Sequence, residues 1–91
     1  MTKRLVLKIT GFVQGVNFRS FIKTKADELK LTGFVKNEND GSVTVEAQGE
    51  ENNLEKLLHA CQTGPQYARV SKTVVNWEAP NKNLSNFTVN Y

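Results

Sequence analysis

Cysteine, proline and long apolar runs are scarce in this 91-residue chain, which contains one cysteine and two prolines. The single Cys61 excludes an internal disulfide and a CxxC metal site, and this fits a reducing compartment. The longest apolar runs are a few residues, too short to span a bilayer, and the N-terminal residues lack the apolar block of a secretion signal. We therefore expect a cytoplasmic protein that forms a single domain, residues 1–91, with one modest core.

The charges are distributed unevenly along the chain. The net charge of +3 arises from 12 Lys and Arg against nine Asp and Glu. Residues 1–36 carry eight of the cations and two of the acids, whereas residues 37–91 carry four and seven. The N-terminal part therefore favours an anionic ligand, but the sign of the charge does not distinguish a small phosphorylated molecule from nucleic acid.

The segment 11–19, GFVQGVNFR, places two glycines and an arginine between a strand-like run and a helix-like run. Glycine allows a tight turn and close approach of a ligand to the main chain. A helix that begins here directs unpaired N–H groups and the positive end of its dipole toward the turn. Arg19 adds a fixed cation suited to phosphate or carboxylate oxygens. The segment predicts an anion site, most simply for phosphate; on spacing alone, the glycines could instead only shape the turn.

Apolar periodicity predicts a strand, a helix and a hairpin in the first half of the chain. Alternating apolar residues predict a strand over residues 4–10. Apolar residues three or four positions apart predict a helix over residues 18–31, and Gly33 would stop it. Residues 33–37 and 42–48 predict two strands joined by an Asp-Gly turn.

The second half predicts a helix and two further strands. Apolar positions with helical spacing predict a helix between Gly49 and Gly64. Residues 68–78 are rich in β-branched residues, but their apolar positions change parity midway, which predicts a bulge or twist. A polar loop over 79–85 follows, and a short final strand is predicted from the alternation of Phe87, Val89 and Tyr91. The order β-α-β-β-α-β predicts an α+β fold in which two helices cover one face of an antiparallel sheet.

Two stretches of the chain resemble the acylphosphatase family. Residues 11–19 are similar to its G-x-V-Q-G-V-x-[FY]-R motif, with Asn17 at the variable position. Residues 33–49 are similar to its G-[FYW]-[AVC]-[KRQAM]-N-x₃-G-x-V-x₅-G motif, with every spacing kept. A weaker match at Gly64-Pro65 and Ala68-x-Val70 resembles the segment ahead of the family's fourth strand.

The resemblance implies a ferredoxin-like α/β sandwich that hydrolyses carboxyl-phosphate anhydrides. It implies that Arg19 binds the phosphoryl group and that Asn37 holds the attacking water. The backbone N–H groups of the loop are expected to help bind the phosphoryl group, at Gln14, Gly15, Val16, Asn17, Phe18 and Arg19.

Elementary chemistry agrees with that expectation. An acyl phosphate releases a carboxylate, whose conjugate acid has a pKa of about 4, so no general acid is required. The transition state spreads charge over the phosphoryl oxygens, and catalysis is mainly positioning and electrostatic stabilisation. The amide of Asn37 can accept from water and donate to phosphate but cannot take a proton, so we expect the proton to pass to a phosphoryl oxygen.

Two alternatives use the same fold: a non-catalytic phosphate-binding domain and an RNA-binding module. Gly33-Phe34-Val35 weakly resembles an RNP1 pattern. RNA-binding domains of this plan stack bases on aromatic residues of their central strands, but the polar faces of the predicted strands 4–10 and 42–48 carry no ring. A metallochaperone would need paired thiolates, and the chain has one cysteine. The sequence does not distinguish an enzyme from a non-catalytic phosphate-binding domain.

Other candidate residues are assigned structural roles. His59 has no ligand-like neighbour on its predicted helix and is expected at the surface, Cys61 continues an apolar stripe into the core, and Asp40 forms a turn. We expect a monomer that takes a small-molecule acyl phosphate, releases inorganic phosphate, binds neither nucleic acid nor membrane, and needs no metal or cofactor.

Overall fold

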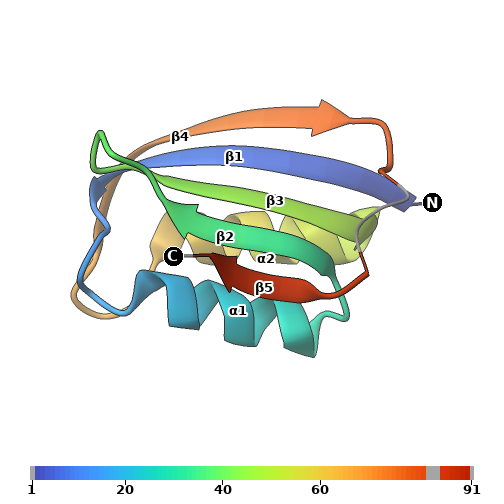
Figure 1. Ribbon diagram of the computed structural model, residues 1–91, viewed down its shortest axis with the longest axis horizontal. Coiled ribbons are helices and arrows are strands. Elements are labelled where there is room, and N and C mark those ends of the chain that lie inside the picture. Colours follow the sequence, from blue (N-terminus) through green and yellow to red (C-terminus); the bar gives the residue numbers. More distant parts are fainter. Residues whose placement is uncertain (1, 82–84, 91) are drawn as a thin grey trace.

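The computed structural model describes residues 2–81 and 85–90, and its elements follow the predicted order (Figure 1). Two helices pack on one face of a five-stranded sheet with the strand order β4-β1-β3-β2-β5. The ferredoxin-like α+β fold is thereby confirmed. The elements are β1 (Thr2–Phe12), α1 (Phe18–Glu28), β2 (Thr32–Asn37), β3 (Val43–Glu50), α2 (Glu51–Thr63), β4 (Arg69–Glu78) and β5 (Phe87–Asn90). Tyr91, predicted in the last strand, lies outside the described residues, as do positions 82–84 of the predicted loop.

The sheet is mixed, and the prediction of a wholly antiparallel sheet is wrong. The pairs β1–β4, β1–β3 and β2–β3 are antiparallel, whereas β5 runs parallel to β2, with Phe87 opposite Gly33 and Val89 opposite Val35. The reason is the position of the last connection. β4 ends at the same end of the sheet where β2 begins, so the chain enters β5 in the direction of β2 (Figure 1).

The first helix ends earlier than predicted, at Glu28 and not at Leu31. Lys30 takes a left-handed φ of 57°. Its N–H donates to the carbonyl of Asp27 at 3.1 Å, and the N–H of Leu31 donates to that of Ala26 at 2.9 Å. This pair of bonds is the Schellman arrangement, which satisfies the last carbonyls of a helix.

Gly33 therefore does not stop the helix as predicted, and it serves the sheet instead. Its φ is 136°, and a Cβ at this position would collide with the carbonyl oxygen of Glu46 on β3. Glycine is thus required at this position of β2, beside the backbone of β3.

The core lies between the sheet and the helices, as the alternating pattern predicted. β1 contributes Leu5, Leu7 and Ile9, all fully buried. The helices contribute Phe18, Ile22, Ala26, Leu54, Leu57 and Cys61. Burial raises the pKa of the Cys61 thiol to about 12. No helix in the described part of the chain is long and apolar enough to cross a membrane.

The predicted irregularity of the fourth strand is confirmed. The pairing of β1 with β4 shifts between Thr10 and Gly11, which face Lys72 and Val70, so Ser71 is an extra residue on β4. A bulge of this kind reverses which face the following residues occupy, so Val70 before it and Val75 after it both pack against the core, whereas Val74 is exposed.

Candidate active site

The loop between β1 and α1 turns through two residues in the left-handed region, Gly15 with φ 74° and Asn17 with φ 67°. A Cβ on Gly15 would meet open space, so it is the backbone conformation that favours glycine there. Asparagine is among the few other residues that adopt this conformation readily. Asparagine at position 17, the variable position of the motif, is therefore compatible with the left-handed backbone of this turn.

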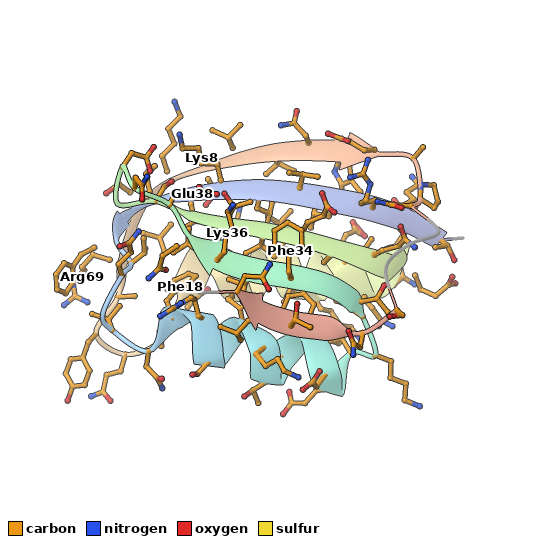
Figure 2. All side chains as sticks on the ribbon, in the orientation of Figure 1. Lys8, Phe18, Phe34, Lys36, Glu38 and Arg69 are labelled. Atoms are coloured by element: carbon orange, nitrogen blue, oxygen red, sulfur yellow. The ribbon has the colours of Figure 1, made fainter. Side chains whose placement is uncertain are left out.

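The first turn of α1 presents backbone donors at the end of this loop. The N–H of Phe21 donates to the carbonyl of Asn17 at 3.1 Å and makes the first bond of the helix. The N–H groups of Phe18, Arg19 and Ser20 precede that bond, so the helix offers them no acceptor. Phe18 is buried beneath this end of the sheet and anchors the turn (Figure 2).

A cavity of about 110 Å³ lies at the N-terminal end of α1. It brings together Arg19 and Asn37, which come from the two different sequence motifs. The volume is well below the roughly 300 Å³ of the smallest drug-sized pockets, so the cavity suits a small ligand or a small part of a larger one. The described residues that line it are Val13, Gly15, Asn17, Phe18, Arg19, Ser20, Asn37 and Val89.

Arg19 is held by the last strand of the sheet. Its Nη1 donates to the backbone carbonyl of Asn90 at 3.2 Å. Asn90 pairs with Lys36, the residue before Asn37 at the end of β2. β5 therefore places the guanidinium beside the strand that carries Asn37.

Asn37 is the last residue of β2 and pairs with Val43. Its side-chain oxygen Oδ1 is buried and has no hydrogen-bond partner among the described residues. An unpaired buried acceptor costs about 1–3 kcal/mol, so its presence in a folded protein calls for a functional explanation. Its place in the lining of the cavity makes it a candidate acceptor for a bound molecule.

The side chain of Gln14 lies away from this cavity and contacts the turn between β2 and β3. Its Nε2 donates to the carbonyl oxygens of Glu38 and Ser42, each at 2.8 Å. Gln14 and Val16 were predicted as phosphate-binding residues, but neither is among the described residues that line the cavity. Val16 packs against the core.

The turn that accepts these bonds is ordered by Asp40, as its predicted role in a turn requires. Its Oδ1 accepts from the backbone N–H of Ser42 at 2.9 Å and from the hydroxyl of the same residue. The Ser42 hydroxyl, followed by the Lys8 ammonium, holds the pKa of the Asp40 carboxyl well below its usual range. The turn and the β1–α1 loop lie at the same end of the sheet (Figure 1).

Sequence reasoning missed Ser20, Val89 and Asn90. Ser20 carries no motif signal beyond its place after Arg19. Val89 and Asn90 come from β5, whose pattern indicates a strand but not its neighbour. His59 is exposed, as predicted, and no group of three or more potential metal-binding side chains occurs within residues 2–81 and 85–90.

A family model described as acylphosphatase matches residues 5–89. The chain belongs to the acylphosphatase family. It is 49% identical over 75 residues to an acylphosphatase of Salinibacter ruber, covering 82% of this chain and 79% of that one. It is 38% identical to an acylphosphatase of Clostridium acetobutylicum over the whole length of both chains. The crystal structure of acylphosphatase from Bacillus subtilis superposes with a TM-score of 0.94 at 34% identity, covering both chains completely.

These relatives support hydrolysis of acyl phosphates as the activity of this acylphosphatase. They do not favour the alternatives of a non-catalytic or RNA-binding module. The acylphosphatase motifs coincide with the parts of the chain that meet at the cavity, the β1–α1 loop and the end of β2.

Proposed function

We propose that the cavity is the active site and that Arg19 and the N–H groups of residues 14–19 hold the phosphoryl group of an acyl phosphate there. The observation that carries this proposal is the meeting of Arg19 and Asn37 in one small cavity at the start of a helix. Positive charge and preorganised donors stabilise the charge that spreads over the phosphoryl oxygens in the transition state.

Asn37 orients the attacking water in this proposal. Its buried, unpaired Oδ1 supports the role of acceptor for a water hydrogen, and the amide nitrogen can donate to the phosphoryl group. The water oxygen bonds to phosphorus while the bond between phosphorus and the acyl oxygen breaks. The electron pair leaves with the carboxylate, and a water proton passes to a phosphoryl oxygen, so an acyl phosphate dianion yields a carboxylate and dihydrogen phosphate.

The chain acts in this proposal as a single-domain, cytoplasmic monomer that binds no nucleic acid. Three cations on the sheet face opposite the helices support the last point, because each of them lies close to an acid. The distances from side-chain nitrogen to carboxylate oxygen are 2.9 Å for Arg4 and Glu46, 2.9 Å for Lys8 and Asp40, and 3.9 Å for Lys36 and Glu38. Phe34 lies on this face beside Lys36, but it is opposite the carboxylate-bearing Glu46, which disfavours a phosphate backbone (Figure 2).

The test is hydrolysis of benzoyl phosphate compared with that of p-nitrophenyl phosphate at equal concentrations. We expect rapid, saturable hydrolysis of the acyl phosphate and negligible hydrolysis of the monoester, whose leaving group is much more basic. Inhibition by inorganic phosphate without hydrolysis would instead indicate a non-catalytic phosphate-binding domain. Equal rates on both substrates would contradict an acylphosphatase.

A further inference from the structure

We propose that Gln14 is a positioning residue that sets the alignment of the phosphate-binding loop with Asn37. The proposal rests on the function proposed above. Both bonds from Nε2 go to carbonyl oxygens of the turn that begins directly after Asn37, at Glu38 and Ser42. The side chain thus links the loop that holds the phosphoryl group to the strand end that holds the water.

The acceptors are themselves fixed in place. The N–H of Glu38 donates to the carbonyl of Ser42 at 2.8 Å and closes the turn, and Ser42 is 1% exposed. An amide group has two N–H donors, and each of them has its acceptor here. The side chain of Gln14 therefore has no donor left for a phosphoryl group, and its contribution to catalysis is indirect.

Within the described residues, the two bonds of Gln14 join the β1–α1 loop to the turn between β2 and β3. Within the described part of the chain, the backbone groups of residues 14–16 take part in none of the backbone–backbone hydrogen bonds found outside the helices and strands. Val13 is buried in the core and Val16 packs against it, but apolar contacts are not directional, whereas the hydrogen bonds of Gln14 fix an orientation. Because a misplacement of about 1 Å between reacting groups can lower a rate about 100-fold, loss of the Gln14 bonds reduces turnover.

Gln48 provides a matched control, since it is a second glutamine that ties a strand to a loop. Its Nε2 donates to the carbonyl of Asn81 at 3.1 Å, and its Oε1 accepts from the N–H of the same residue. Gln48 pairs with Arg4 and Thr32, at the end of β3 remote from Asn37. Its removal perturbs stability in a similar way without touching the cavity.

The experiment compares Gln14→Met with Gln48→Met, because methionine has a similar length and no donor. The measurements are kcat and KM for benzoyl phosphate, the inhibition constant of inorganic phosphate, and the urea midpoint. We expect Gln14→Met to lower kcat about tenfold or more while the phosphate constant changes less than about threefold. Gln48→Met should retain wild-type kcat at a similar loss of stability.

Several outcomes would overturn the proposal. A kcat within about twofold of wild type in Gln14→Met would make Gln14 a stabilising residue only. If the inhibition constant of inorganic phosphate rose by the same factor as kcat fell, Gln14 would instead be a phosphate ligand. A second variant, Gln14→Asn, keeps the two N–H donors on a shorter side chain. If neither Gln14→Met nor Gln14→Asn folds, the role of Gln14 is to stabilise the protein and the proposal is wrong.

A double-mutant cycle with Asn37→Ala tests whether Gln14 acts through Asn37. Relative to Asn37→Ala alone, the double variant with Gln14→Met should have a kcat less than about twofold lower. The reason is that the Asn37 side chain, which Gln14 aligns with the loop, is already missing. Independent losses that multiply would contradict the proposal. An active wild type, an impaired Asn37→Ala and a normal Gln14→Met would refute this inference alone, whereas a wild type without acyl phosphate hydrolysis would refute the function on which it rests.

Discussion

The ammonium of Lys8 on β1 lies 2.9 Å from a carboxylate oxygen of Asp40 in the turn between β2 and β3. The same carboxyl accepts two bonds from Ser42, and these bonds are the main reason that its pKa lies below the usual value of 3.8. Asp40 therefore helps to fix the turn whose carbonyls receive the Gln14 side chain.

The first prediction concerns the pH dependence of this contribution. A carboxyl whose pKa is depressed on folding stabilises the protein fully above its unfolded pKa of about 4, and this contribution is lost progressively as the pH falls toward the lower folded pKa. Asp40→Asn should lower the urea midpoint at pH 7, and its difference from wild type should shrink at pH 3. A difference that is equal at both pH values would show that the charge of Asp40 contributes nothing.

The second prediction concerns Arg19→Ala. Loss of a preorganised charge on the phosphoryl group should cost about 3 kcal/mol in the transition state, which corresponds to a roughly 150-fold lower kcat/KM. Binding of inorganic phosphate should weaken as well, while the circular dichroism spectrum stays unchanged. Lys23→Ala is the control, because Lys23 pairs with Asp27 at 2.6 Å on α1, does not line the cavity, and should leave turnover intact.

The third prediction concerns Asn37→Ala. If its amide orients water, kcat should fall far more than the affinity for inorganic phosphate, measured as a competitive inhibitor. Asn39→Ala changes an exposed asparagine of the adjacent turn and should have little effect. Equal losses of phosphate affinity in Asn37→Ala and Arg19→Ala would assign Asn37 to phosphate binding.

The fourth prediction concerns pH and metals. A guanidinium stays protonated and an amide does not ionise around neutral pH, so kcat should be nearly flat there. Chelator should leave the rate unchanged, and so should His59→Gln. A steep rise of kcat through pH 6–7 that disappears in His59→Gln would establish a histidine base and refute the mechanism.

The sequence predicted the faces of the strands and the two motifs well, because both depend on local spacing. Leu5, Leu7 and Ile9 are buried as their alternation predicted, and the parity change in β4 corresponds to a real bulge. The two predicted catalytic residues line one cavity, although their roles remain predictions. A two-residue period identifies the buried face of a strand, and a fixed motif retains its spacing, whatever the rest of the chain does.

Local sequence patterns did not predict the features that depend on contacts between distant parts of the chain. The alternation in residues 87–90 does not reveal that β5 lies parallel to β2, so neither the mixed sheet nor the place of Val89 in the cavity was predicted. The end of α1 was misplaced because Lys30, a residue with a β-carbon, takes the left-handed conformation usually given to glycine. In the same way, the side-chain partners of Gln14 lie 24 and 28 residues away and leave no mark on its own motif.

The four-residue strand β5 is an edge strand, and it supplies both a wall of the cavity and the carbonyl that holds Arg19. Short edge elements open at a lower free energy than the centre of a sheet, so β5 can detach while β1 and β3 remain paired. Such a partly opened molecule would keep most of its core and lose its catalytic geometry. In rising urea, turnover should therefore fade before the fluorescence of Trp77, on the opposite edge strand β4, reports unfolding of the sheet.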